Sequence, residues 1–254
     1  MVLVFLVLAA FTAGWVDAVV GGGGLIQLPA LLLGLPGASP VQILATNKLG
    51  SIFGTTTSSI TYFRRVRPDL RTALPLAGAA FAGSVGGALI ASRIPGEAFN
   101  PIILVVLIAV GAYTIFKPDI GSISALRFSG RAHVAVACVV GFLIGAYDGA
   151  LGPGTGSFLV FALVGLLGYG FLQASAKAKI ANMATNAAAL VVFIPQGAVL
   201  WQVGLMMGAF NVLGGYVGAR TAVAAGSGFV RAVFIAVVGS FIVKIGYDTF
   251  VQFS

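Results

Sequence analysis

Apolar runs of about twenty residues, separated by short polar gaps, follow one another along the whole chain. A helix needs a run of this length to cross the hydrocarbon core of a bilayer. Runs such as "PIILVVLIAVGAYTIF" do not alternate with polar residues, which argues against an outer-membrane barrel. The pattern therefore predicts an all-α polytopic membrane protein, with spans at 2–20, 42–63, 72–92, 98–116, 132–150, 176–194, 201–222 and 231–250.

Two shorter apolar stretches, 24–35 and 156–168, each follow a glycine-rich segment. Twelve or thirteen helical residues reach only about 20 Å, well short of a hydrocarbon core of about 30 Å. We expect each to be a short or broken helix bordered by a glycine break. The sequence leaves open whether these pieces cross the membrane or re-enter it.

The chain contains an internal repeat at a constant offset of 131 residues. Glycine matches arise easily by chance in a chain with 36 glycines. Matches between charged residues do not, because charged residues make up only 8% of the chain. We expect two homologous transmembrane halves, 1–120 and 131–254, joined by a cytoplasmic connector at 121–130. The matched pairs include Phe11/Phe142, Gly14/Gly145, Asp17/Asp148, Lys48/Lys179, Gly83/Gly214 and Gly87/Gly218.

Loop charges predict that the two halves are inverted in the membrane. The segment "RRVRPDLR" at 64–71 should be cytoplasmic because arginine is enriched there, whereas its counterpart "PQGAVLWQ" at 195–202 carries no charge and should be external. Inversion needs an odd number of crossings per half, which four long spans and one short piece supply. Both termini of a cell-membrane protein would then be external. The cytoplasmic side should hold Lys117, Arg127, Arg131, Lys177, Lys179, Arg220 and Arg231, and the outside Arg93 and Glu97.

Composition narrows the class of function. The chain has 254 residues, of which 59% are hydrophobic, so a soluble domain is excluded. The net charge of +8 lies in short gaps between spans, so we expect no nucleic-acid partner. The sequence offers no metal cluster, no nucleophile paired with its single histidine and no phosphate-binding loop, so we expect neither an enzyme nor a cofactor.

Inverted repeats with interrupted helices are typical of secondary transporters, which bind substrate near the midplane. A break leaves unpaired N–H groups and a partial positive charge at the start of the next helix, and two such starts suit an anion. The alternative is that the glycines only permit close packing. The predicted anion-binding positions are Gly22, Gly23 and Gly24 in the first half and Gly154, Thr155 and Gly156 in the second, with Gly21, Gly152 and Ser157 beside them.

Two lysines recur inside predicted helices at the same repeat position, Lys48 and Lys179. A lysine deep in a span costs on the order of 3 kcal/mol on insertion scales, which makes it a functional candidate. The alternative is that these side chains snorkel to the interface. The recurrence favours a role in the anion site, with polar neighbours contributing from the same helices: Thr46, Asn47, Asn182 and Asn186.

Asp17 and Asp148 stand just before the two glycine breaks. A carboxylate at the end of a helix faces the negative end of its dipole, which disfavours ionisation unless a cation is close. Each aspartate has three candidate roles, namely pairing with the lysine of its own half, binding a coupling cation, or holding a proton, and we favour proton coupling. The alternative is a hydrogen bond to the broken backbone nearby.

These residues also carry a family resemblance. The segments "AGWVDAVVGGGGLIQLPALLLGLP" and "ILATNKLGSIFGTTTSSITYFRR", with "GAYDGALGPGTGSFLVFAL", "AKAKIANMATNAAALVVF" and "GAFNVLGGYVGAR" in the second half, resemble the sulfite exporter TauE/SafE family. The resemblance implies a membrane permease for small sulfur-containing anions that works without ATP hydrolysis. One departure is that the second glycine motif contains Pro153 and Thr155, so the two half-sites should differ.

The sequence thus predicts a secondary transporter that exports a small sulfur-containing anion, such as sulfite, a sulfonate or thiosulfate, by alternating access. The expected partners are this anion, the lipid bilayer and a coupling proton or cation, and a homo-oligomer stays open. The alternatives are a passive anion channel and a membrane scaffold or assembly protein that transports nothing. The repeated intramembrane Asp and Lys argue against the scaffold, which gives no reason to maintain their cost.

Overall fold

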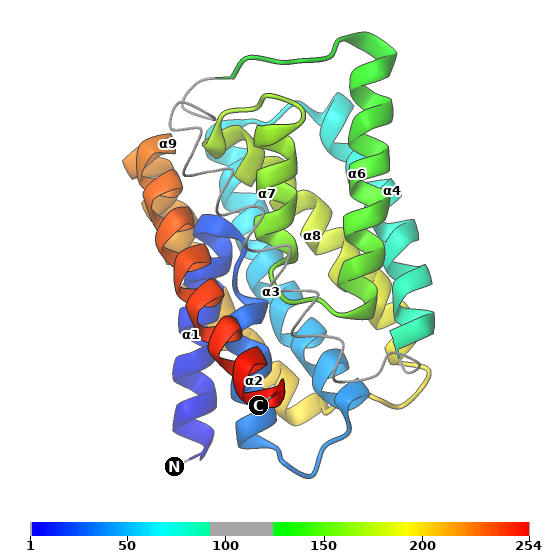
Figure 1. Ribbon diagram of the computed structural model, residues 1–254, viewed down its shortest axis with the longest axis vertical. Helices are drawn as coiled ribbons and strands as arrows, with labels where there is room; N and C mark the ends of the chain where they lie inside the picture. The colour runs from blue at the N-terminus through cyan, green and yellow to red at the C-terminus, as the bar shows by residue number, and fades with distance from the viewer. Residues whose placement is uncertain (1, 92–123, 254) are drawn as a thin grey trace.

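The computed structural model describes residues 2–91 and 124–253. The predicted span 98–116, part of the connector, and Arg93, Glu97 and Lys117 lie outside the described residues. The described parts form helices joined by turns (Figure 1). These helices are α1 (Val2–Val20), α2 (Gly24–Gly34), α3 (Pro40–Val66), α4 (Leu70–Ile90), α6 (Gly130–Ala150), α7 (Thr155–Gly165), α8 (Phe171–Phe193) and α9 (Trp201–Phe253).

The helices start and end within a few residues of the predicted spans, and local chemistry accounts for several of the boundaries. Ser39 caps α3, accepting a hydrogen bond from Gln42 N while the Gln42 side chain bonds back to Ser39 N, and Pro40 occupies the first turn. Asp69 caps α4. The predicted spans 201–222 and 231–250 are joined in α9, whose one non-helical residue is Gly226, with φ +78°. In Figure 1 the chain turns back at this point.

Four helices in the described part of the chain are long and apolar enough to cross a membrane: Val2–Val20, Leu70–Ile90, Gly130–Ala150 and Trp201–Val237. The helices α3 and α8 are just as long but more polar, because they carry buried lysine, asparagine and threonine side chains. They pack against each other as well as against α4 and α9, so their polar faces are turned toward protein. Their polarity marks them as the centre of the bundle.

The short helices α2 and α7 return to the end of the molecule from which the chain came. Gly34, at the end of α2, lies against Leu6 near the start of α1. The segment before α6 pairs with the end of α7, because Ala125 N donates to Gly168 O and Arg127 N to Leu167 O. Helices α1 and α2 therefore form one hairpin and α6 and α7 another. Both α1 and α6 are long and apolar enough to cross a membrane, as the sequence predicts.

These hairpins enter the molecule from opposite ends. In Figure 1, α1 rises from the lower end, where the N-terminus is marked, whereas α6 descends from the upper end. Each hairpin brings the chain back to its own side, and α3 then crosses from bottom to top while α8 crosses from top to bottom. Such a hairpin contributes no net crossing, so the turn between α3 and α4 still lies opposite the start of α1.

The two halves exchange contacts with each other. Helix α4 packs on α6, and α9 packs on α1, so a later helix of each half covers the first helix of the other. Glycines make both crossings close: Gly83 lies against the carbonyl oxygen of Phe142, and Gly214 lies against that of Phe11. These two contacts are equivalent, because their residues are separated by the repeat offset of 131. A β-carbon at Gly83 or Gly214 would overlap the backbone of the other helix, so the close crossings require glycine.

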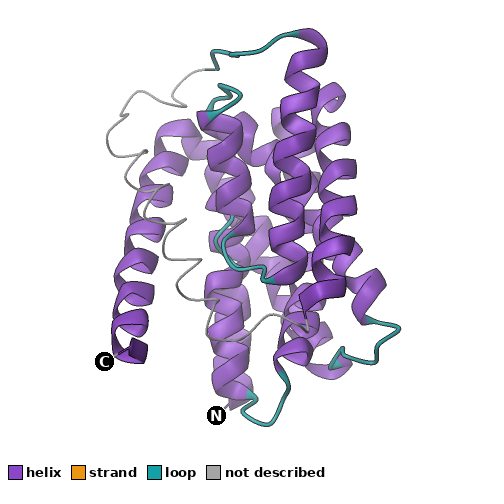
Figure 2. Cartoon of the chain, turned by 45° about the vertical axis from the view of Figure 1, so that its right-hand side comes forward, coloured by secondary structure: helices purple, strands orange, loops and turns teal. Residues whose placement is uncertain are grey.

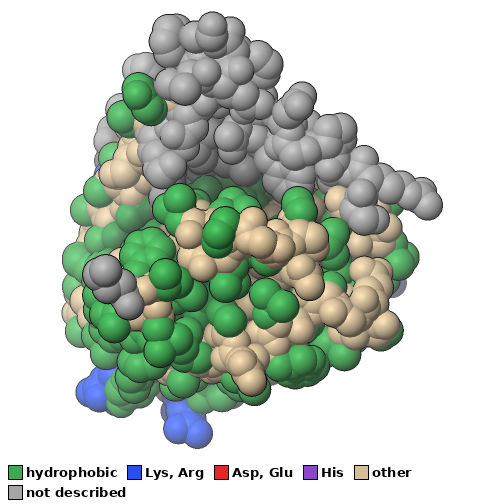
Figure 3. All heavy atoms as spheres, turned by 90° about the horizontal axis from the view of Figure 1, so that it is seen from below, with side chains coloured by type: hydrophobic (Ala, Val, Ile, Leu, Met, Phe, Trp, Pro, Cys, Tyr) green, Lys and Arg blue, Asp and Glu red, His purple; other side chains and the backbone are tan. Residues whose placement is uncertain are grey.

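Charge is distributed unequally between the two ends. The exposed arginines gather where α3 ends, α4 and α6 begin and α9 bends, at the upper end in Figure 1. Figure 3, the view from below, shows apolar and uncharged side chains across the described face and Lys or Arg only at its rim. Buried apolar side chains form two clusters, and α1 contributes Leu6 and Ala10 to one and Val16, Val19 and Val20 to the other. Asp17 lies where α1 passes between them.

Candidate functional site

The tips of the two hairpins meet inside the molecule. Ser157 N donates to Gly21 O (3.1 Å), and the Ser157 hydroxyl donates to Val20 O (2.9 Å). Gly21 lies directly on the backbone of Gly156, and a β-carbon at either residue would overlap the other chain segment. In Figure 2 the loop between α6 and α7 lies at mid-height rather than at an end. The two glycine breaks, 131 residues apart in sequence, thus form one central structure.

Backbone geometry explains the glycines at the tips. Gly21 has φ +83° and Gly152 has φ +92°, in the left-handed region that residues other than glycine rarely adopt. These two residues are partners at the repeat offset. Gly154, which precedes α7, is also left-handed at φ +78°. The expectation that glycine breaks each span is confirmed, and glycine is needed for both conformation and close approach.

Two buried ion pairs link the halves beside these tips. Lys48 Nζ lies 2.7 Å from Asp148 Oδ1, and Lys179 Nζ lies 2.8 Å from Asp17 Oδ2. Each pair joins a lysine of one half to the aspartate of the other, so the pairing within a half, considered from the sequence, is wrong. Asp17 and Asp148 occupy equivalent positions of the repeat, and so do Lys48 and Lys179. The two ion pairs are therefore equivalent contacts.

Burial decides the role of the lysines. Lys48 is 1% exposed and Lys179 0% exposed, so neither side chain snorkels to the membrane interface. The loop-charge argument assigned Lys179 to the cytoplasmic side, whereas the structure pairs it with Asp17 beside the hairpin tips. A buried pair is weak evidence for stability, since desolvation offsets its Coulomb attraction, whereas an unpaired buried charge is costly. The two pairs therefore keep four buried charges mutually compensated at the centre of the protein.

A small cavity of about 20 Å³ lies between the hairpin tips and the central helices α3 and α8. It has room for about one water molecule. Both halves contribute to its wall, and both aspartates of the ion pairs belong to it. The lining residues are Asp17, Gly21, Gly24, Asn47, Lys48, Ser51, Asp148, Gly152, Thr155, Gly156, Asn182 and Asn186.

Two acceptor atoms of the cavity wall have no hydrogen-bond partner within the described part of the chain. They are Asn47 Oδ1 and Asp148 Oδ2, and both side chains are almost fully buried. Buried acceptors are normally satisfied, and an exception calls for a proton, a water or an ion. Asp148 thus uses one carboxylate oxygen for Lys48 and keeps the other available.

Most of the predicted site residues reach this cavity, but five do not line it. The Thr46 hydroxyl accepts from Leu200 N (3.1 Å), just before α9 begins, so this side chain joins two helices instead. Lys179 does not line the cavity but pairs with Asp17, which does. The remaining three, Gly22, Gly23 and Gly154, shape the tips, and Gly23 packs on Ala13 and Asp17.

Sequence analysis missed several residues of the central region. Ser51 lines the cavity and lies 131 residues before Asn182, so the repeat offset together with its position one turn after Lys48 is a signal that identifies it. The pair Gln27 and Asn211 is also buried, with Asn211 Nδ2 donating to Gln27 Oε1 (2.6 Å). No repeat partner or charge pointed to this pair.

A cluster of polar side chains lies at the upper end of the molecule in Figure 1, where α4, α6 and α8 begin. His133 Nε2 lies 2.8 Å from the Tyr169 hydroxyl, which donates to Thr72 Oγ1, and Lys177 Nζ donates to Asp69 O. Lys177 is fully buried under Tyr169 rather than on the surface. Partial burial of Asp69 would raise its pKa, but hydrogen bonds from Arg71 N and Thr72 together with the Lys177 charge lower it below the usual value.

Helix termini complete the electrostatics of the centre. The N-termini of α2 and α7 both lie at the hairpin tips, and Gly24, Thr155 and Gly156 from their first turns line the cavity. The positive ends of two helix dipoles thus adjoin two lysines, which favours negative charge. The C-termini of α1 and α6 lie at the same tips and offset part of this effect. The lysines supply the formal charge.

Comparison with known proteins gives one family and several relatives. The family model described as "Sulfite exporter TauE/SafE" matches residues 6–245. A probable membrane transporter protein, ORF9, of Sinorhizobium sp. is 41% identical over 92% of this chain and 88% of its own length. A probable membrane transporter protein of Haemophilus influenzae is 33% identical over 97% of this chain and 95% of its own. Escherichia coli K12 YfcA, also a probable membrane transporter protein, is 32% identical over 98% and 91%. No solved structure matches the chain significantly.

Proposed function

Because the chain belongs to the sulfite exporter TauE/SafE family, and is therefore a multi-pass membrane transporter and not an enzyme, we propose that it exports a small sulfur-containing anion. Sulfite, a sulfonate and thiosulfate are the candidates. The observation that carries the proposal is the buried cavity between the two hairpin tips, with Lys48 in its wall and two helix N-termini beside it. Family membership sets aside the alternative of a scaffold that transports nothing.

The substrate would bind where the carboxylates now contact the lysines. An oxyanion offers several acceptor oxygens, and Lys48, Thr155 and the amides of Asn182 and Asn186 offer donors around one small volume. It would replace Asp148 as the partner of Lys48. The shared wall supports a site at the interface of two halves, which is the usual arrangement in secondary transporters.

Charge balance supports coupling to a proton. The two ion pairs sum to zero charge, and a monoanion added to this buried neutral site would carry an uncompensated charge. A proton on Asp148 cancels that charge and frees Lys48 for the anion. The unpartnered Asp148 Oδ2 in the cavity wall is the atom that would take the proton. Export would then be driven by the anion and proton concentration gradients together and not by the membrane potential, since the complex of a monoanion and a proton carries no net charge.

The volume of the site supports alternating access. A cavity of about 20 Å³ has room for about one water, so a sulfur oxyanion needs the hairpin tips and ion pairs to separate. The contacts that hold the tips together cross between the halves, from Ser157 to Val20 and Gly21. Motion of one half relative to the other would break these contacts and open the site toward one side.

We further propose that the two halves are inverted repeats, with the arginine-rich end cytoplasmic and both termini external. Support comes from the opposite directions of α1 and α6, the exchanged contacts and the enrichment of exposed arginine at one end (Figure 1). Single cysteines replace exposed residues in the two loops, Arg67→Cys and Gln196→Cys, in a Cys138→Ser background. An impermeant maleimide should label position 196 in intact cells and position 67 only after permeabilisation. Labelling of both positions from one side contradicts the inversion.

Flux in proteoliposomes tests the transport proposal. Protein is reconstituted with sulfite, a sulfonate or thiosulfate inside, and anion efflux and internal pH are followed together. We expect saturable efflux with protons moving in the same direction, and little response to membrane potential for a monoanion. Lys48→Met should abolish efflux, whereas Asp148→Asn should keep it and lose proton movement, because Lys48 is then free at any pH.

Arg131→Gln is the control, because this exposed arginine lies at the upper end of α6, away from the cavity. It should leave both signals unchanged. Efflux that follows membrane potential without saturation indicates a passive channel. Proton movement that persists in Asp148→Asn assigns coupling to another group. No efflux of any of the three anions refutes the substrate class while leaving family membership intact.

A further inference from the structure

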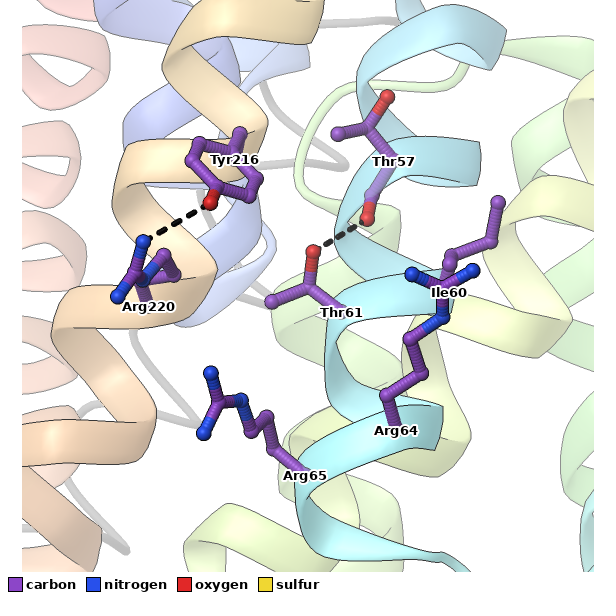
Figure 4. A pocket seen from close by; sticks show the side chains of 7 residues that line it. All are labelled: Thr57, Ile60, Thr61, Arg64, Arg65, Tyr216 and Arg220. Atoms are coloured by element: carbon purple, nitrogen blue, oxygen red, sulfur yellow. Dashed lines mark hydrogen bonds between the residues drawn. The ribbon is translucent and has the colours of Figure 1, made fainter.

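A second basic site lies at the arginine-rich end, between α3 and α9. Its cavity of about 300 Å³ is at the lower end of the size range of ligand pockets. Figure 4 shows Arg65 from α3 extending into the gap between the two helices, Arg220 lying along α9 beside Tyr216, and Arg64 running back along α3 past Ile60. The cavity is lined by Thr57, Ile60, Thr61, Arg64, Arg65, Tyr216 and Arg220.

The three arginines form no salt bridge with an acidic residue in the described parts of the chain. Arg220 Nη1 donates to the Tyr216 hydroxyl (2.9 Å) and its guanidinium lies 5.5 Å from the centre of the Tyr216 ring, which fixes its direction. The hydroxyls of Thr57 and Thr61 donate to backbone carbonyls within α3. Donor groups on the arginines therefore dominate the chemistry of the pocket, and they suit a phosphate.

The surface that continues from this pocket toward the middle of the molecule is apolar. On α3, Phe53 and Ile60 lie on the same stripe as the pocket residues, four and three residues from Thr57, and both are exposed. On α9, Leu213 lies three residues before Tyr216 and is also exposed. Phe53 packs over Gly208, so this apolar strip is continuous across the two helices. One surface thus combines a basic end with an apolar strip.

We propose that this surface, from Arg64, Arg65 and Arg220 to Phe53 and Leu213, binds an anionic phospholipid of the cytoplasmic leaflet. The lipid phosphate would lie between the arginines and an acyl chain along the apolar strip. A soluble anion matches the arginines but leaves the strip uncovered, whereas a lipid matches both. Basic pockets between membrane helices on the cytoplasmic side are where lipid headgroups are held. The bound lipid would bridge α3, which carries Lys48, and α9, which belongs to the other half.

Native mass spectrometry of the detergent-solubilised protein tests this proposal. The wild type is titrated with phosphatidylglycerol and with phosphatidylcholine of the same acyl chains. We expect about 10-fold tighter binding of phosphatidylglycerol, in line with the attraction of several arginines for an anionic headgroup. The triple variant Arg64→Gln, Arg65→Gln, Arg220→Gln should lose this preference. A triple variant with the same loss of charge at the same end, Arg71→Gln, Arg127→Gln, Arg131→Gln, should keep it.

Four results overturn the proposal. Equal binding of the two lipids by the wild type rules out headgroup recognition. A preference that survives in the first triple variant, or is lost equally in the second, rules out this pocket as its source. Displacement of phosphatidylglycerol by glycerol 3-phosphate would show that the arginines bind a soluble phosphate. Because binding is measured without transport, failure here leaves the transport proposal unaffected.

Discussion

Lys48→Met is expected to destabilise the protein by about 3–5 kcal/mol, because it leaves the Asp148 carboxylate buried without its partner. Asp148→Asn should cost a similar amount by stranding Lys48. The double variant should cost clearly less than the sum of the two, with a coupling of about 2–3 kcal/mol, because neither buried charge remains. Unfolding by SDS in mixed micelles, followed by tryptophan fluorescence, measures the free energy of unfolding of the wild type and of each variant.

The matched cycle combines Lys48→Met with Asp17→Asn, the aspartate of the same half. Asp17 pairs with Lys179 at 2.8 Å, so its coupling to Lys48 should be much weaker. A stronger coupling of Lys48 to Asp17 than to Asp148 would contradict the exchange of ion pairs between halves. The transport proposal adds that the double variant Lys48→Met, Asp148→Asn regains its fold but not its anion flux, which separates stability from function.

Gly21→Ala is expected to cost about 2–5 kcal/mol and to abolish transport. Alanine is strained at φ +83°, at a cost of about 1–2 kcal/mol, and its β-carbon would overlap the backbone of Gly156, which adds about 1–3 kcal/mol of overpacking. The tips would separate, and the hydrogen bonds from Ser157 to Val20 and Gly21 would be lost. The same SDS titration, together with sulfite efflux from proteoliposomes, measures both effects.

Gly197→Ala separates the cost of the left-handed backbone from the cost of the overlap with Gly156. Gly197 has a left-handed φ of +65°, and no atom lies within 4 Å of the position that a β-carbon would take, so this variant carries the conformational cost alone. It should lose about 1–2 kcal/mol and keep its efflux. Gly78→Ala, in α4 with the same open surroundings, should gain about 0.5–1 kcal/mol. Equal losses for Gly21→Ala and Gly197→Ala would show that contact with Gly156 is unimportant.

The positions of the helices and of their breaks could be predicted from the sequence, because these depend on local properties. Apolar runs must be helical in lipid, and glycine allows the left-handed backbone at Gly21 and Gly152. The repeat offset also brought out Asp17, Asp148, Lys48 and Lys179 as the charges of interest. These residues are recognisable because intramembrane charge is expensive and rarely recurs without a reason.

Which charges meet, and where each helix ends inside the molecule, depends on packing between segments far apart in the sequence. Loop charges assigned Lys177 and Lys179 to the cytoplasmic side but gave neither a partner, whereas packing buries both, against Asp69 O and Asp17. Spacing along one chain assigns no partner, so the pairing of Lys48 with Asp148 follows from two hairpins entering from opposite ends. The nineteen-residue helix Val2–Val20 is long and apolar enough to cross a bilayer. Packing decides where it ends, because its tip meets the tip of the other hairpin inside the molecule.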